Sequence, residues 1–113
     1  MKREERLIKN FEFKQVYATG KSRAAKHAII FFRKNNREIC RLGVVISKKV
    51  GKSVVRHRLK RLCKEAFRRI KTQGNMEKGY DIIIVARKGA APLKFAEVLT
   101  EMTELFKKGN ILR

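Results

Sequence analysis

The segment from Ser47 to Ser53 holds the residues best suited to binding an anion. It reads S-K-K-V-G-K-S and leads into a long helical stretch, where free backbone amides and the positive end of a helix dipole favour a phosphate. Its Gly-Lys-Ser end is similar to a nucleotide-binding P-loop, but that pattern needs a second glycine where this chain has Ile46, and no carboxylate-bearing strand follows to hold magnesium. The segment is therefore either a loop that grips a nucleic-acid phosphate or a plain capped turn.

Residues for hydrolytic chemistry are sparse. Protein nucleases commonly use clustered carboxylates with metal ions, or a pair of histidines as acid and base. The one aspartate is Asp81, the glutamates are scattered, and His27 and His57 have no evident third partner. Ser47 and Lys48 are adjacent, so their side chains point apart and do not form a dyad. We predict no catalytic residue and no metal ligand in the protein.

The sequence favours a reducing, cytoplasmic location. Cys40 and Cys63 belong to no Cys-x-x-Cys or Cys/His cluster, so we expect free, half-buried thiols. The longest wholly apolar runs, Ala28 to Phe32 and Ile82 to Ala86, are five residues each, far short of a membrane span. The opening M-K-R-E-E-R leads into no signal-peptide stretch. We expect no membrane association.

The overall charge points to a polyanionic partner. The 113 residues include 30 Lys and Arg against 10 Asp and Glu, a net charge of +20. A chain with this excess repels itself unless an anion accepts the charge. Because 43% of the residues are hydrophobic, the chain is still expected to fold, as a single domain over residues 1–113.

The charge is concentrated on one predicted helix, from about Ser53 to Gln73. Between Lys48 and Lys71 there are eleven basic residues and one acid, Glu65. At about 100° per residue, the apolar residues fall on one side: Val55, Leu59, Leu62, Cys63, Ala66, Phe67 and Ile70. The opposite side carries His57, Lys60, Arg61, Lys64, Arg68 and Lys71, with Arg56 and Arg58 at the boundary.

This cationic stripe is unlike an ordinary solvated face. Solvated helix faces interleave Glu with Lys at i, i+4, because like charges at that spacing are destabilising. Here one Glu stands among many cations, so we interpret the stripe as a nucleic-acid-binding surface. Binding through phosphates would be strongly salt-dependent.

The remaining elements define the frame that positions this helix. We expect a first helix from Asn10, its N-cap, to Gly20 in a left-handed position, with Phe13, Val16 and Tyr17 on one face. The strands are expected at 21–25 (a short edge strand), 28–34 and 42–46, the last two forming a hairpin, and at 80–86, covered on both faces.

The helices complete an α+β architecture. Ser53 is the expected N-cap of the basic helix and Gly74 its stop, and a last helix is expected from Leu93 to Lys108. That helix has an apolar stripe for the core and an acidic stripe, interpreted as solvated, made of Glu97, Glu101 and Glu104. We predict a small α/β sandwich with three helices packed on one mixed sheet of about four strands.

A long signature segment lies across the start of the basic helix. From Ser47 to Arg68 the chain reads S-K-K-V-G-K-S-V-V-R-H-R-L-K-R-L-C-K-E-A-F-R, which resembles the signature of the bacterial ribonuclease P protein component. The first helix, with Phe13, Val16-Tyr17 and Gly20, and the strand from Ile82 to Arg87 also resemble that family. The resemblance spans about Arg6 to Lys108.

The resemblance implies an RNA-binding subunit of an endoribonuclease. In that family the protein binds a large catalytic RNA, and the complex removes the 5′ leader of precursor transfer RNA. The RNA carries the chemistry with Mg²⁺, which agrees with the absence of protein catalytic residues. The resemblance also implies a monomeric protein within the complex and a left-handed βαβ crossover, where right-handed is the default.

Two surfaces follow from the resemblance and the charge pattern. The residues expected to meet the catalytic RNA are Lys48, Lys49, Lys52, Arg56, Arg58, Lys60, Arg61, Lys64 and Arg68. A cleft between the first helix and the exposed sheet face is expected to hold the single-stranded leader, with Phe13, Tyr17 and Phe31 stacking on bases. Without the resemblance, closing the core is the alternative role of Phe13 and Tyr17.

The sequence departs from the family in two places. His57 stands where the family most often has Asn, an imidazole in place of a short amide. Phe11 replaces an expected polar residue and is either a hydrophobic staple or a third aromatic on the cleft rim. The rival interpretations are a ribosomal protein, a protein-only nuclease, and a transcription factor reading the major groove, the last without a helix-turn-helix partner.

Overall fold

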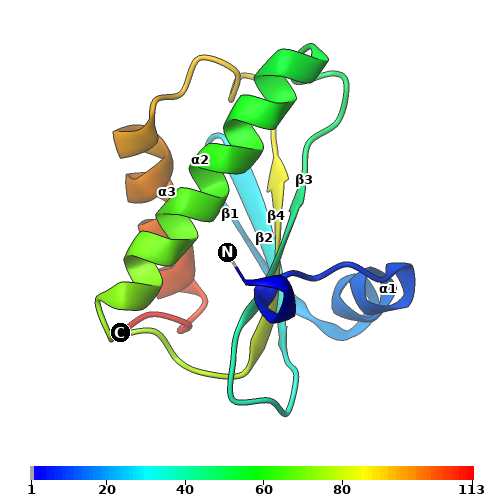
Figure 1. The fold of residues 1–113 in the computed structure, drawn as a ribbon, viewed down its shortest axis with the longest axis vertical. Helices are drawn as coiled ribbons and strands as arrows, with labels where there is room; N and C mark the ends of the chain where they lie inside the picture. The colour runs from blue at the N-terminus through cyan, green and yellow to red at the C-terminus, as the bar shows by residue number, and fades with distance from the viewer. Residues whose placement is uncertain (1) are drawn as a thin grey trace.

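A computed structural model describes residues 2–113 as one four-stranded sheet between helices. The elements are a 3₁₀ turn η1 (Arg3–Glu5), α1 (Asn10–Thr19), β1 (Lys21–Ala24), β2 (Ala28–Lys34), β3 (Arg41–Val45), α2 (Ser53–Thr72), β4 (Tyr80–Ala86) and α3 (Phe95–Lys108). In Figure 1 the sheet is seen nearly edge-on, with α2 and α3 on one side and α1 on the other. The predicted α+β class, with three α-helices and a mixed four-stranded sheet, is confirmed.

The predicted hairpin between residues 28–34 and 42–46 is wrong. The strand order is β1-β2-β4-β3, so β4 lies between β2 and β3, antiparallel to the first and parallel to the second. The physical reason is burial, because Ile82, Ile83 and Ile84 of β4 are at most 1% exposed and need both neighbouring strands and both sheet faces covered. The hairpin that does form joins β1 to β2.

The parallel pair β3 and β4 is joined through α2, which makes the βαβ unit that carries the basic helix. Since β3 and β4 are direct neighbours, α2 crosses over a single strand spacing and lies across one face of the sheet. The left hand of this crossover stays a prediction.

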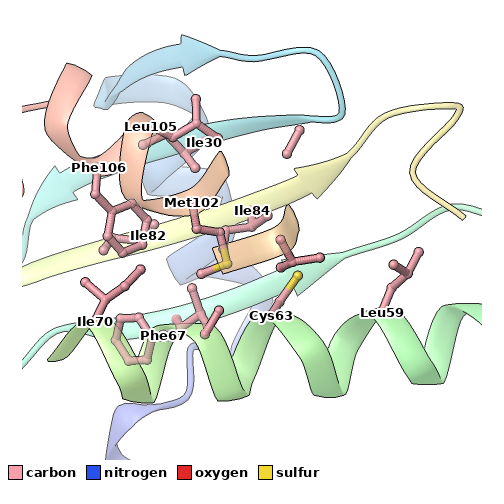
Figure 2. Packing of buried hydrophobic residues seen from close by; sticks show 14 of the residues in the cluster. Ile30, Leu59, Cys63, Phe67, Ile70, Ile82, Ile84, Met102, Leu105 and Phe106 are labelled. Carbon is pink, nitrogen blue, oxygen red and sulfur yellow. The ribbon is translucent and has the colours of Figure 1, made fainter. Parts of the chain in front are cut away.

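The main core lies between the sheet and the pair α2 and α3. Figure 2 shows Leu59, Cys63, Phe67 and Ile70 of α2 directed at the strand residues and at α3. The rings of Phe67 and Phe106 meet edge to face, with centroids 6.5 Å apart. The predicted apolar stripe of α2 is therefore the stripe that the fold buries.

Several predicted helix ends differ by a residue or two. Lys9 is the N-cap of α1, and its backbone N–H donates to Glu12 Oε1 at 3.3 Å, so Glu12 caps the helix in place of Asn10. Lys52 is the N-cap of α2, with Ser53 as the first helical residue, and α3 begins at Phe95. Gly74, with φ +80°, ends α2 as predicted.

Gly20 is not the left-handed cap that the sequence suggested. Its φ is −84°, which any residue adopts. A Cβ at this position would lie 2.5 Å from the Val16 carbonyl oxygen and 2.6 Å from that of Phe32. Glycine is needed here because the end of α1 lies directly against β2.

Other expectations are also corrected. Cys40 and Cys63 are both free, and both are fully buried rather than half-buried. Glu101 is not solvated with its neighbours, because it accepts hydrogen bonds from the backbone N–H of His27 at 3.1 Å and pairs with His27 Nδ1 at 3.0 Å. No helix in residues 2–113 has the length and apolar character required to cross a bilayer.

Candidate nucleic-acid interface

The nine predicted catalytic-RNA contacts all lie on α2 or in the loop before it, and none is buried. Five are fully exposed and four partly exposed. The exposed ones are Lys48, Lys49, Lys52, Arg61 and Arg68, and the partly exposed ones are Arg56, Arg58, Lys60 and Lys64. His57 is exposed among them. We call these nine residues the cationic ridge.

Very little of the ridge is neutralised by the protein itself. Arg68 pairs with Glu65 one turn earlier on α2, and its guanidinium holds the pKa of that carboxyl below its usual range. Lys71, just beyond the ridge, pairs with the buried Glu5 of η1. Over residues 2–113 the other eight ridge residues form no ion pair. The ridge therefore presents uncompensated charge to solvent.

Two ridge arginines also hold the protein together. Arg58 donates from Nη1 to the Ala91 carbonyl at 3.3 Å and from Nη2 to the Leu93 carbonyl at 2.6 Å, which fixes the loop before α3. Arg56 donates from Nε to the Gly51 carbonyl at 3.2 Å and so closes the approach loop onto the helix. Their contacts with RNA stay predictions, and replacing them would also disturb these loops.

The sheet face away from α2 and α3 is built in cross-strand rows. The pairing register aligns Ser22, Phe31, Ile83 and Gly43 in one row, and Ala24, Ile29, Val85 and Val45 in the next. The α1 helix covers the first row, where Ile83 is buried beneath Val16. In the second row every side chain keeps some exposure. This half-open sheet face beside α1 is where the sequence predicts the leader-binding cleft, and its binding of a leader stays a prediction.

The three predicted leader-binding aromatics gather at this cleft. The rings of Tyr17 and Phe31 meet edge to face, with centroids 4.9 Å apart and planes at 77°. The Phe13 ring rests on Gly43, where a Cβ would lie 2.6 Å from Phe13 Cζ. Tyr17 is 42% exposed, and its partial burial raises the pKa of the phenol. These rings both pack against the sheet and present surface to solvent.

A buried ionic network fixes α1 over the sheet. Arg41 of β3 donates from Nε and Nη2 to the two carboxylate oxygens of Asp81, at 2.8 and 2.7 Å, and from Nη1 to Glu12 Oε2 at 2.5 Å. Asn35 adds a hydrogen bond to Asp81 Oδ1 at 2.8 Å. The two carboxylates raise the pKa of Arg41, with Asp81 the larger cause. Glu12 adjoins Phe13, so the network sets where the aromatic face of α1 lies.

A groove connects the ridge with the cleft. It runs along the outer edge of β3 and is lined by Lys60 and Lys64 from α2 and by Phe13 from α1. Leu7 bonds to this edge through its backbone N–H, 3.0 Å from the Leu42 carbonyl oxygen. The two surfaces inferred from the sequence are therefore adjacent.

The other sequence candidates do not assemble a catalytic centre. The Asp81 carboxylate pairs with Arg41, and the His27 ring pairs with Glu101. In the described part of the chain no three His, Cys, Asp or Glu side chains come together as metal ligands. Phe11 is 58% exposed, so it is not a hydrophobic staple, and the Lys9 ammonium lies 5.8 Å from its ring centroid.

Sequence reasoning missed Arg41, Glu12 and Gly43. The only signal for Arg41 was its place before an alternating strand, which does not reveal a partner 40 residues away. Gly43 gave a clearer hint, since a glycine inside a strand often marks a close approach.

Comparison with known proteins agrees with this arrangement. The family model described as Ribonuclease P matches residues 1–110. The ribonuclease P protein component of Clostridium botulinum strain Langeland is 41% identical over 109 residues, covering 96% of this chain and 97% of the relative.

Two solved structures share the fold. The ribonuclease P protein of Thermotoga maritima matches with a TM-score of 0.82 and 34% identity, covering 92% of this chain and 96% of that one. That of Staphylococcus aureus matches with a TM-score of 0.86 and 26% identity, covering 96% and 98%. With a family model over nearly the whole chain and a relative of this identity, the chain belongs to the ribonuclease P protein component family.

Proposed function

We propose that this chain, as the protein subunit of ribonuclease P, binds two RNA elements at once. The cationic ridge binds the RNA subunit, and the cleft beside α1 binds the single-stranded 5′ leader of precursor transfer RNA. The observation that carries this proposal is the adjacency of eight cations without carboxylate partners and a half-open aromatic cleft, joined along the edge of β3.

The ridge supplies affinity through phosphate neutralisation. Each Lys or Arg that meets a phosphate releases condensed counter-ions, so affinity falls steeply with salt. Six of the nine residues project from α2, a rigid helix whose apolar side is buried in the core, so little ordering of these six is needed on binding.

The cleft supplies selectivity for a leader without demanding its sequence. Unpaired bases stack on the exposed surfaces of Tyr17, Phe31 and Phe13, and every base has a face that can do so. Holding the leader next to the ridge places the cleavage junction beside the catalytic RNA. The chemistry belongs to that RNA with its Mg²⁺, and the protein works as one copy per complex in the cytoplasm.

A reconstitution tests the proposal directly. Purified protein is added to ribonuclease P RNA and precursor transfer RNA at a magnesium concentration where the RNA alone is slow. We expect cleavage of the precursor to increase. We also expect the protein to raise the affinity of the complex for leader-bearing precursor more than its affinity for leaderless transfer RNA. Unchanged cleavage, or tighter binding to ribosomal RNA than to ribonuclease P RNA, would reject the role.

A further inference from the structure

A hollow of about 380 Å³ at one end of the sheet is not used by either surface described above. It lies where α1 ends and β1 begins, and it is also lined by the last residues of β2 and by the turn after α3. Its volume is within the range of pockets that hold small ligands, roughly 300 to 1,000 Å³. The residues that line it indicate which kind of ligand it would bind.

The rim is cationic. Lys21, Arg33 and Lys34 line the hollow, and no carboxylate does. Within the described residues these three make no ion pair. The acid opposite Arg33 in the strand register is Asp81, whose two oxygens already accept from Arg41. The charge of this rim is therefore available to an external anion.

The wall of the hollow is aromatic. The Phe32 and Tyr80 rings meet at 62° with centroids 6.2 Å apart, and Tyr80 keeps some exposure while Phe32 is buried. Gly109 lies against the Phe32 ring, since a Cβ there would be 2.9 Å from Phe32 Cζ. An aromatic surface beside several cations matches a planar base with a phosphate.

The hollow lies just beyond the Tyr17–Phe31 pair. Thr19 and Gly20 of its lining follow Tyr17 at the end of α1, and Arg33 follows Phe31 two residues along β2, about 7 Å of strand. Phe32, Lys34 and Tyr80 alternate with Phe31 and face the α2 and α3 side of the sheet. An RNA strand stacked on Tyr17 and Phe31 therefore reaches the hollow by turning around the end of β2, past the end of α1.

We infer that this hollow is a nucleotide-binding pocket, with the base against Tyr80 and the phosphate among Lys21, Arg33 and Lys34. The nucleotide belongs to the single strand that lies on Tyr17 and Phe31, and this second statement rests on the proposed function. A free nucleotide has the same chemistry, so the experiment must separate the two sources.

Tyrosine fluorescence separates the pocket from the cleft. The chain has two tyrosines and no tryptophan, so Tyr17→Phe leaves Tyr80 as the sole reporter and Tyr80→Phe leaves Tyr17. Each variant is titrated with adenosine monophosphate and with single-stranded RNA of roughly 4 and roughly 12 nucleotides, which bracket common single-strand site sizes. We expect the long RNA to quench both reporters, and the short RNA to quench mainly Tyr17.

The rim is tested on the Tyr80 reporter. Adding Arg33→Gln and Lys34→Gln should weaken quenching of Tyr80 by long RNA about tenfold in affinity, as expected for lost phosphate contacts at low salt. Lys14→Gln, an exposed cation elsewhere on α1, is the matched control and should change affinity far less.

Every outcome bears on one of the two statements. If adenosine monophosphate quenches Tyr80 but long RNA does not, the hollow binds a nucleotide, and the inference that this nucleotide belongs to the strand on Tyr17 and Phe31 is overturned. Unchanged Tyr80 emission while Tyr17 is quenched overturns the pocket and leaves the leader cleft intact. Quenching of Tyr80 without quenching of Tyr17 overturns the leader cleft and keeps the pocket.

Discussion

The two faces of the sheet are packed to different degrees. The face under α2 and α3 is closed, with Ile30, Ile82 and Phe67 at most 1% exposed. On the face under α1, Ile83 is buried beneath the helix, but Phe31, Val45 and Val85 keep part of their surface in solvent. Both faces carry apolar side chains, and they differ in how much of that apolar surface a helix covers.

This comparison suggests a division of labour. The closed face holds α2 in place and provides most of the burial that stabilises the fold. The open face keeps apolar and aromatic surface unburied, where it contributes less to stability and is free to bind. The charge is divided in the same way, because the cations project from the outer side of the helix that the closed face anchors.

The largest expected difference between the two faces is in the effect of a Phe→Ala substitution on stability. Phe67→Ala removes a fully buried ring and should lower the free energy of unfolding by about 3 to 5 kcal/mol. Phe31→Ala should cost clearly less, because that ring is partly exposed and the open face can relax. Urea denaturation measures both. Equal losses would show that the two faces are packed alike.

Unlike the aromatic residues of the open face, the ionic network around Arg41 should contribute strongly to stability. Arg41→Met leaves the buried Asp81 and the half-buried Glu12 without a cation and should destabilise the protein by about 3 kcal/mol. The same unfolding measurement on Arg37→Met, an exposed arginine, provides the control. If the two variants are equally stable, the network does not anchor α1.

The aromatics of the open face should matter more for binding than for folding. Phe13→Ala is expected to weaken binding of leader-bearing precursor transfer RNA by roughly 1 to 3 kcal/mol, about 5- to 150-fold, with leaderless transfer RNA little affected. Competition binding to the assembled complex distinguishes the two substrates. A similar loss for both would contradict a cleft that holds the leader.

The smallest expected effect concerns the thiols of the closed face. Burial raises the pKa of Cys63 to about 12 and also raises the pKa of Cys40, so at about pH 8 neither carries an appreciable thiolate. Folded protein should therefore resist iodoacetamide, measured by mass spectrometry, until denaturant is added. Ser22→Cys on the open face should react readily; modification of Cys63 at the same rate would contradict the burial.

Local patterns predicted most of the fold. The period of α2 separates its buried residues from its cations, because both stripes depend only on spacing along one helix. The same holds for the aromatic face of α1, with Val16 buried and Tyr17 exposed beside it. Here a residue's neighbours in sequence decide its environment.

Contacts between elements far apart in the chain could not be predicted from the sequence. The insertion of β4 between β2 and β3 depends on where the most apolar strand finds cover, not on the turn between 35 and 40. Arg41 reaches Glu12 and Asp81, on elements far apart in the chain, and no spacing announces such a contact. The sequence therefore predicted which aromatic residues lie at the cleft, but it did not predict the Arg41 network that fixes α1 beside them.

Uncompensated charge on and before α2 is the feature that we propose binds the RNA subunit. The most direct test measures the affinity for ribonuclease P RNA against salt for the unmodified protein and for Lys48→Gln/Lys49→Gln/Arg61→Gln, three exposed residues whose loss should leave folding unchanged. We predict that the slope of log K against log salt becomes less negative by about 2 to 3, one phosphate contact per cation. An unchanged slope would contradict the claim.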